Sequence, residues 1–517
     1  MGLGEGSTGR TDGGCASASV ERRGILGMSE KTVASVTVAA VVMLALALRL
    51  YQLGSESLWG DEGCSLSDAA SWYLRGPRPL YYLLLREWIE LGAGGSEFLL
   101  RIPALAFGVG GVWVLYALGR RLFGHPAALL ASVFMAISVL HVNHSQEVRM
   151  YSLTTLGPLL AAYFLMLALD RGRTRYLLAY VGFAFVSLLT FPLTALVLGA
   201  HGLFLLLYAR AYRPVSLVLL GGQLAFLAAW LPWLSRNVHV SASFGEGYIA
   251  MLDKPSLPDI VALSGQFFLW KWSDPGPILT AGAFGFSFMV LAVALYGLKG
   301  VRRTDASPAF VWLWLIVPVA GMVMLSYSVA NMWMVRYLIA ASPAFYLLVS
   351  KGICSLRNRY VAGAVVLVVM ALTLGRLGLY YARPVRPEWR PAVAYVHTHE
   401  RPGDVIGIYS AGNQFVFRYY YRGRAQWAPL GADLSREQQF GEWSDAEVRE
   451  ALADFPFTGQ RFWMIFSKHT FRGGFNIIGY LTRRYRVLDH RSYNKLELYL
   501  FDAGGQPVPG ESLRREG

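Results

Sequence analysis

The sequence VASVTVAAVVMLALALRL at residues 33–50 leads into LWGDE at residues 58–62, and these two stretches decide the fold. The first is apolar and long enough to form a transmembrane helix. It follows a basic flank of three cations, Arg22, Arg23 and Lys31. The positive-inside bias keeps such cations in the cytoplasm. The helix therefore ends on the outer face, where it places the adjacent carboxylates of Asp61 and Glu62.

Composition places the chain among membrane proteins. Of its 517 residues, 55% are hydrophobic and only 15% are charged, whereas roughly a quarter are charged in soluble proteins. The formal net charge of +14 is spread between apolar segments and is not gathered on one basic face, which argues against nucleic-acid binding. The composition predicts a polytopic α-helical protein that contacts membrane lipids and binds no nucleic acid.

Apolar segments recur along the chain and are separated by polar loops. The eleven segments expected to span the membrane are 33–50, 99–118, 126–141, 152–169, 176–190, 193–208, 215–234, 277–298, 309–329, 335–350 and 360–380. With the N-terminus inside, every second loop is cytoplasmic, and each of those loops carries Arg or Lys, as the positive-inside rule requires. An odd number of spans places the C-terminus outside. We therefore expect a multi-pass protein of the plasma (inner) membrane with a cytoplasmic N-terminus.

Composition also divides the chain into three parts. Residues 1–28 are rich in Gly and Ser and are expected to form a disordered cytoplasmic tail. Residues 29–383 hold the apolar segments. Residues 384–517 are polar and are expected to form a soluble extracytoplasmic α/β domain. Its expected helix and strands are 387–399, 405–409, 461–466 and 495–501.

A second outer loop carries a dense polar patch. Residues 141–151 read HVNHSQEVRMY and include Glu147 and Arg149, and Arg101 and Arg336 lie on the same predicted face. Ionisable groups beside hydrocarbon are costly unless they are paired or functional. Carboxylates with arginines suit a base that deprotonates a hydroxyl while cations hold a phosphate. The alternatives are acids that are merely solvated at the interface, or an ion-paired cap of the loop.

Five motifs resemble those of the GT-C glycosyltransferases. They are LWGDE at 58–62, PLYYLLL at 79–85, EFLLRIPAL at 97–105, SQEVRMY at 145–151 and VRYL at 335–338. The motifs occur in order over most of residues 33–380. They are most similar to the branch of protein O-mannosyltransferases and the aminoarabinose transferases of lipid A. The resemblance implies a GT-C-like fold of about 11 transmembrane helices, in which residues 29–383 form the catalytic domain.

The resemblance also implies an activity and a set of site residues. A hexosyl or pentosyl group would move from a polyprenyl-phosphate donor to a hydroxyl of a lipid, glycan or protein acceptor on the outer face, with inversion. Asp61 matches the catalytic aspartate and would be the general base, Glu62 would orient or bind beside it, and Glu147 matches the acid of the second outer loop. These three acids are the expected catalytic residues. The residues expected to bind substrate are Arg101, Arg149, Tyr151, Arg336, Tyr337 and Tyr82.

The sequence departs from the family pattern before Pro79, where Arg78 stands in place of the usual His. This departure leaves metal dependence open. Asp61, Glu147 and His144 are candidate ligands for a divalent metal ion, because hard cations prefer oxygen ligands and can assist a leaving phosphate. Arginines alone could balance the same charge.

Two other classes of protein remain as alternatives. A transporter or lipid flippase usually places ionisable residues near the bilayer midplane and shows related, interrupted halves. The mid-span positions here are nearly free of charge, and no internal repeat is evident. A non-catalytic scaffold that presents residues 384–517 is the third hypothesis. In that case, changing Asp61 would matter less than deleting the C-terminal domain.

Overall fold

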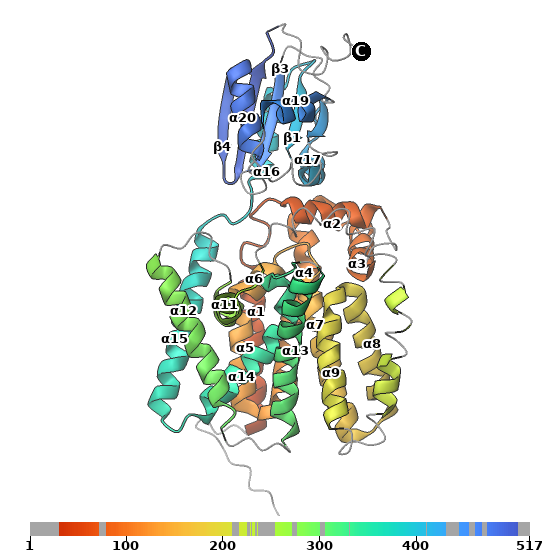
Figure 1. Ribbon diagram of the computed structural model, residues 1–517, viewed down its shortest axis with the longest axis vertical. Helices are drawn as coiled ribbons and strands as arrows, with labels where there is room; N and C mark the ends of the chain where they lie inside the picture. Colours follow the sequence, from red (N-terminus) through yellow and green to blue (C-terminus); the bar gives the residue numbers. More distant parts are fainter. Residues whose placement is uncertain are drawn as a thin grey trace, which may run out of the picture.

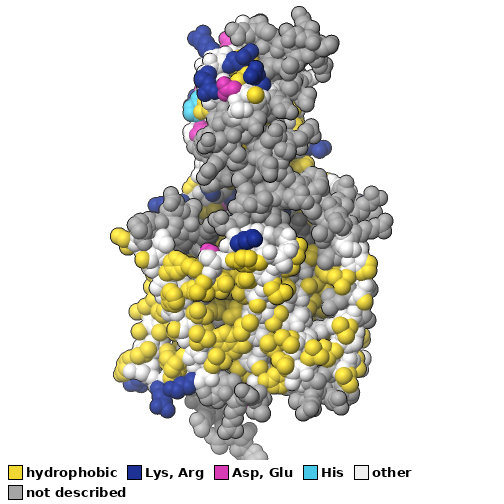
Figure 2. Space-filling view, viewed as in Figure 1, with side chains coloured by type: hydrophobic (Ala, Val, Ile, Leu, Met, Phe, Trp, Pro, Cys, Tyr) yellow, Lys and Arg dark blue, Asp and Glu magenta, His cyan; other side chains and the backbone are white. Residues whose placement is uncertain are grey.

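The chain forms a helical bundle with a C-terminal sheet domain stacked on one end (Figure 1). The computed structural model describes residues 30–71, 79–208, 217–224, 228, 230–232, 235, 254–270, 277–299, 305–329, 331–409, 411–430, 444–453, 461–467 and 473–504. The predicted tail of residues 1–28 and part of the predicted segment 215–234 lie outside the described residues. Figure 2 shows a broad belt of hydrophobic side chains around the bundle, with Lys and Arg side chains at its lower edge. The chain is a multi-pass membrane protein.

Within the described residues, seven helical segments are long and apolar enough to cross a membrane. They are α1 (Glu30–Leu50), α4 (Glu97–Phe123), α7 (Tyr151–Arg171), α12 (Pro277–Tyr296), α13 (Ala306–Ser328), η3 (Val335–Ala341) joined to α14 (Ser342–Ser355), and α15 (Arg359–Ala382). An eighth forms if α5 (His125–Ile137) and α6 (Val139–Ser145), which meet at a 58° bend, are one span. The shorter helices are α8 (Thr174–Thr190), η2 (Pro192–Thr194), α9 (Ala195–Leu207) and α11 (Leu257–Leu269).

The count of eleven spans is therefore not confirmed. The predicted segments 176–190 and 193–208 form helices that fall short of a full crossing, and segment 126–141 is broken at Ser138. Apolar composition identifies helices that lie in the bundle, but it does not distinguish a straight crossing from a short or broken one. The helical membrane fold itself is as predicted.

Arg49 stabilises the bend between α5 and α6. A break at Ser138 leaves backbone carbonyls of α5 without their usual helical partners. The guanidinium of Arg49 is fully buried, and its Nη1 donates to Ala136 O at 3.0 Å while its Nη2 donates to Met135 O at 3.3 Å. Ser138 Oγ donates to Phe267 O at 2.7 Å. The bend is thus hydrogen-bonded, and it directs α6 toward the polar loop that follows it.

Two short helices lie at the end of the bundle that faces the C-terminal domain, and α2 runs across it (Figure 1). They are α2 (Gly60–Ala70) and α3 (Pro79–Glu90), and η1 (Ala93–Gly95) leads from them into α4. The first turn of α2 contains Asp61 and Glu62, and negative charge is favourable at a helix N-terminus. The LWGDE motif at 58–62 therefore leads into a helix at the junction of the two parts.

The C-terminal part is a sheet domain with helices, as predicted, but the sheet has five strands, of which the sequence pattern indicated three. Its helical elements are α16 (Trp389–His399), η4 (Ala411–Asn413), α17 (Gln414–Tyr420), α19 (Asp445–Ala453) and α20 (Gly473–Arg484). Its strands are β1 (Val405–Tyr409), β2 (Gln426–Leu430), β3 (Arg461–Ser467), β4 (Arg486–Tyr493) and β5 (Leu496–Asp502). The strand order is β2-β1-β3-β5-β4, with β1 parallel to β2 and β3, and β5 antiparallel to β3 and β4.

The C-terminal domain packs directly on α2. A Cβ added to Gly63 would lie 2.5 Å from Val416 Cγ2 and 2.8 Å from the backbone nitrogen of Val416 in α17, so the two helices touch where α2 has no side chain. The hydroxyl of Tyr420 accepts a hydrogen bond from Leu58 N at 2.7 Å and donates to Glu97 at 2.9 Å. The helix that begins with Asp61 is thus fixed between the bundle and the sheet domain.

Candidate active site

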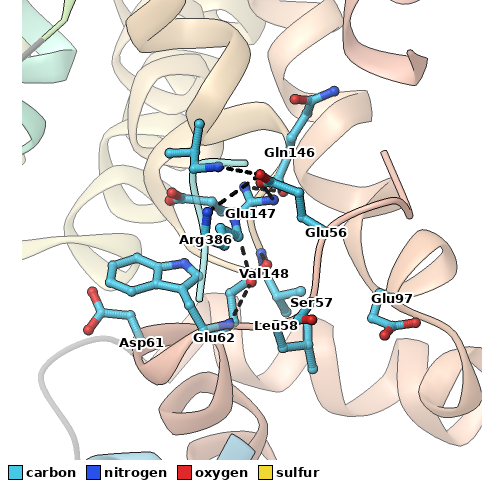
Figure 3. Close-up of polar contacts among 12 residues, drawn as sticks. Glu56, Ser57, Leu58, Asp61, Glu62, Glu97, Gln146, Glu147, Val148 and Arg386 are labelled. Atoms are coloured by element: carbon cyan, nitrogen blue, oxygen red, sulfur yellow. Dashed lines mark hydrogen bonds and ion pairs between the residues drawn. The ribbon is translucent and has the colours of Figure 1, made fainter. Parts of the chain in front are cut away.

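The adjacent acids Asp61 and Glu62 have opposite environments. Figure 3 shows Glu62 turned toward Val148 and Arg386, and Asp61 turned the other way. The side chain of Glu62 is fully buried, whereas that of Asp61 is 33% exposed. Consecutive residues on a helix point about 100° apart, which separates the two carboxylates. Of these two acids, only Asp61 has a carboxylate that a solvent-borne or membrane-borne ligand can reach.

Glu62 is held by four hydrogen bonds. Arg101 donates from Nε to Oε1 and from Nη2 to Oε2, both at 3.0 Å, which is the bidentate geometry that guanidinium and carboxylate groups favour. The backbone of Val148 donates to Oε1 at 2.8 Å and that of Trp59 to Oε2 at 3.2 Å. Glu62 therefore joins α2, α4 and the loop after α6.

Arg101 is fully buried, and all of its N–H groups are occupied. Besides its contacts to Glu62, Nη1 donates to Leu53 O at 2.8 Å and to Glu56 O at 3.0 Å, and Nη2 donates to Ser57 O at 3.1 Å. This arginine fixes the segment between α1 and α2 to α4. It has no N–H left for a substrate.

Two arginines flank Asp61. Arg149 Nη2 lies 3.6 Å from Asp61 Oδ2, and Arg336 Nη1 lies 3.5 Å from the same oxygen. Arg149 also donates to the backbone carbonyl of Asp61 at 3.0 Å and to Ser65 Oγ at 3.2 Å. Burial would lower the pKa of Arg149, but the charge of Asp61 raises it well above its ordinary value, so the guanidinium stays charged. Sequence motifs 275 positions apart, which were predicted to share one face, thus meet at one carboxylate.

Glu147 is buried in the loop that follows α6. It accepts hydrogen bonds from His144 Nδ1 at 2.9 Å and from Asn143 Nδ2 at 2.8 Å. Burial alone would raise the pKa of Glu147, but the charge and hydrogen bond of His144, together with Arg386 and Asn143, lower it to about 2. The carboxylate is therefore ionised at neutral pH. Among the described residues, His144 Nε2 has no hydrogen-bond partner.

Aromatic side chains surround the two arginines. The guanidinium of Arg149 lies 5.9 Å from the ring centroid of Tyr151, and that of Arg336 lies 5.6 Å from that of Tyr337. Such contacts orient a guanidinium without occupying its N–H groups. The hydroxyl of Tyr82 is buried, and no residue in the described part of the chain pairs with it. Tyr151 and Tyr337 thus lie beside the arginines that flank Asp61, and the hydroxyl of Tyr82 has no hydrogen-bond partner among the described residues.

Arg386 belongs to the same region, although sequence reasoning missed it. It lies after α15 and is buried, with Nη1 3.3 Å from Glu56 Oε2 and Nε 3.8 Å from Glu62 Oε2. Its Nη2 donates to Gln146 O at 2.8 Å. No local motif marks it, because its partners lie 240 and 330 positions away in the sequence. The sequence indicated only that Arg386 follows the last apolar segment, 360–380.

The candidate metal ligands do not form a metal site as they lie. Asp61 is paired with arginines, and both oxygens of Glu147 accept hydrogen bonds from Asn143 and His144. Throughout the described ranges, no three His, Cys, Asp or Glu side chains come together in a way that could hold a metal ion. The arrangement instead offers arginines as the cations beside Asp61.

One protein-family model matches part of the chain. The family model for dolichyl-phosphate-mannose-protein mannosyltransferases matches residues 76–235, which include Arg101, Glu147 and Arg149 but not Asp61 or Arg336. No curated protein sequence matches the chain.

Solved structures match almost the whole chain. ArnT from Cupriavidus metallidurans in the apo state is 15% identical, with a TM-score of 0.57, over 91% of this chain and 99% of that one. Its complex with undecaprenyl phosphate is 15% identical, with a TM-score of 0.54, over 90% of this chain and 97% of that one. The archaeal oligosaccharyltransferase AglB from Archaeoglobus fulgidus also matches, in a structure with an inhibitory peptide and a dolichol-phosphate. It is 12% identical, with a TM-score of 0.53, over 92% of this chain and 75% of that one. The fold is that of the GT-C glycosyltransferases, and the predicted resemblance is confirmed.

Proposed function

We propose that this chain is a membrane glycosyltransferase that moves a hexosyl or pentosyl group from a polyprenyl-phosphate donor to an acceptor hydroxyl, with Asp61 as general base. The observation that carries the proposal is the environment of Asp61. Of the three predicted acids it alone is partly exposed, and two arginines lie beside it. The GT-C fold supports the same class of reaction.

The proposed reaction is a single displacement at the anomeric carbon. The acceptor oxygen bonds to this carbon while its proton passes to a carboxylate oxygen of Asp61. The bond between the anomeric carbon and the phosphate oxygen breaks, and its electron pair leaves with the polyprenyl phosphate. A single displacement inverts the configuration of the sugar. A positioned base of this kind accelerates a reaction by about 10²–10⁴-fold.

Arg149 and Arg336 are suited to the phosphate of the donor. Guanidinium groups bind phosphate oxygens with two parallel hydrogen bonds, and their positive charge stabilises the negative charge that a leaving phosphate acquires. In the structure both groups face Asp61. When the donor binds, the arginines can pair with its phosphate instead, which leaves the carboxylate free to accept a proton. Donor binding would thereby prepare the base.

Glu62, Arg101 and Glu147 are proposed to position the site and not to contact the substrate. Their charged groups are buried, and each is occupied by protein partners. This changes the roles expected from the resemblance, in which Glu62 and Glu147 were catalytic and Arg101 bound substrate. Tyr82, whose hydroxyl has no partner among the described residues, remains a candidate to bind the sugar.

The site is proposed to face the outside of the plasma (inner) membrane, with the N-terminus in the cytoplasm. The basic last turns of α4 and α7, with Arg120, Arg121 and Arg171, lie at the opposite ends of these helices from the site residues Arg101 and Tyr151. The positive-inside rule puts those basic ends in the cytoplasm. The C-terminal domain would then be extracytoplasmic.

A panel assay tests the proposed function. Purified protein in proteoliposomes is incubated with polyprenyl-phosphate hexoses and pentoses and with lipid, glycan and peptide acceptors, and products are identified by mass spectrometry. Undecaprenyl and dolichyl carriers come first, because the ArnT and AglB structures contain their phosphates. Asp61→Asn should slow, by about 10²–10⁴-fold, a transfer that Glu90→Gln, at an exposed ion pair, leaves unchanged. Movement of a lipid across sealed vesicles without a glycosidic product would favour the transporter alternative.

A further inference from the structure

We propose that the C-terminal domain positions the active site through Arg386, which it holds against the acids next to Asp61. This inference rests on the proposed function for its catalytic consequence. Its structural basis is a continuous chain of contacts from the turn between β4 and β5 to the first turn of α2. In this view the C-terminal domain is a working part of the membrane site and not a separate module.

The first step is the environment of Arg386. Figure 3 shows its guanidinium among Glu56, Glu62 and Glu147, which come from three different segments of the chain. With Arg101, it balances three buried or half-buried carboxylates. Removing one cation from such a cluster leaves like charges in a medium that screens them poorly. The loop 146–150 and the start of α2 would then separate.

The second step is the support of the linker that carries Arg386. Asn494 Nδ2 donates to Pro384 O at 3.1 Å and to Arg386 O at 2.8 Å, and Lys495 Nζ donates to Val385 O at 2.5 Å. Both residues lie in the turn between β4 and β5. Lys495 has a φ of 61°, an uncommon conformation for a residue with a side chain.

The backbone of Asn494 strengthens the same support. Its N–H donates to Glu388 Oε2 at 2.7 Å, and its carbonyl accepts from Glu388 N at 3.1 Å. The turn therefore makes five hydrogen bonds to the linker, from Pro384 to Glu388. A rigid support of this kind is what holds a functional group in its productive geometry.

The third step leads from Arg386 to Asp61. Arg386 contacts Glu62, and Glu62 is the third residue of α2 and accepts from the backbone of Trp59. Asp61 lies between Trp59 and Glu62 in the same helical turn. A displacement of about 1 Å in a reacting group can cost about 100-fold in rate. A substitution that loosens Glu62 would therefore displace the carboxylate of Asp61 indirectly, through the shared helical turn.

The test compares Arg386→Ala with Arg390→Ala in the full-length protein. Arg390 also joins the two domains, through Glu97, but its side chain is 44% exposed and it contacts none of the acids around Arg386. We expect Arg386→Ala to lower kcat about 100-fold while the donor KM changes little. Because Arg386 helps to lower the pKa of Glu147, its loss should also move the acid limb of the pH–rate profile to higher pH. Arg390→Ala should change neither.

Hydrogen–deuterium exchange provides a readout that needs no substrate. Arg386→Ala should speed exchange in segments 58–64 and 146–150, and Arg390→Ala should not. Asn494→Ala, which leaves Arg386 intact, should loosen the same segments to a smaller degree. Ser492→Ala is its control, because Ser492 Oγ donates to Glu497 within the same hairpin.

The outcomes separate this inference from the proposed function. Unchanged exchange and unchanged kcat in Arg386→Ala would overturn the positioning role, whatever the wild-type protein transfers. Faster exchange in a protein that transfers no sugar from any donor would support the positioning role and overturn the proposed function. Slower transfer with unchanged exchange in both segments would also count against positioning.

Discussion

Asp61 and Glu62 are neighbours whose substitution should have opposite effects. Asp61→Asn should remove the base and keep the protein stable, whereas Glu62→Gln should destabilise the protein. The reason is burial. Asp61 is 33% exposed and its ion pairs are 3.5 and 3.6 Å long, whereas Glu62 is fully buried and holds Arg101 at two points.

The magnitudes follow from these environments. A partly exposed ion pair contributes about 0–1 kcal/mol, so Asp61→Asn should leave thermal stability nearly unchanged. Loss of a general base should lower kcat by about 10²–10⁴-fold. Removing one partner of a buried pair costs about 3–5 kcal/mol, because the remaining charge is left uncompensated. Glu62→Gln should therefore unfold at a clearly lower temperature than the wild-type protein.

Two measurements check this contrast. The soluble fraction after heating in detergent reports stability, and the transfer rate per folded molecule reports catalysis. Combining Arg101→Met with Glu62→Gln should cost less stability than the sum of the two single substitutions, because each single change leaves one buried charge unpaired. Equal thermal stability of Glu62→Gln and wild type, or full activity of Asp61→Asn, would refute the reasoning.

Four further outcomes are expected. Arg336→Ala should raise the donor KM about tenfold or more and leave the thermal midpoint unchanged, because a partly exposed ion pair adds about 0–1 kcal/mol; initial rates against donor concentration measure it. The lowered pKa of Glu147 contributes stability that is complete above its ordinary value of 4.5 and is lost as pH falls toward about 2, so Glu147→Gln should flatten the acid limb of a pH–stability curve. Gly63→Ala should cost about 1–3 kcal/mol through its clash with Val416, whereas Gly182→Ala, which has open space around it, should not, as thermal unfolding can show. Transfer should survive EDTA, since arginines supply the cations beside the base; a loss that Mg²⁺ or Mn²⁺ restores would contradict this.

The motifs in the sequence predicted which residues meet but not how each one is used. The positive-inside pattern placed Asp61, Arg149 and Arg336 on one face, and the structure brings them together at one carboxylate. Asp61 and Glu62 carry the same chemical group, and only the direction in which each leaves α2 separates an accessible acid from a buried one. Arg101 belongs to a recognisable motif, yet three of its partners are backbone carbonyls that no motif records.

Long-range contacts account for most of what the sequence could not show. The strands at 405–409 and 461–467 were predictable from local pattern, since short apolar runs and neighbouring turn residues mark them. The number of spans was not, because Arg49 supports a bend at Ser138 through carbonyls 86 and 87 positions away. Arg386 was missed for the same reason.

The grip of the β4–β5 turn on residues 384–388 has a practical consequence for protein engineering. A chimera that exchanges the sheet domain of one GT-C protein for another, and is cut at the end of the last helix, would graft a foreign turn onto a native linker. The foreign turn would then lack the hydrogen bonds that Asn494 makes to the linker that carries Arg386. A functional graft should carry the linker, the turn and the acids opposite Arg386 as one inherited unit.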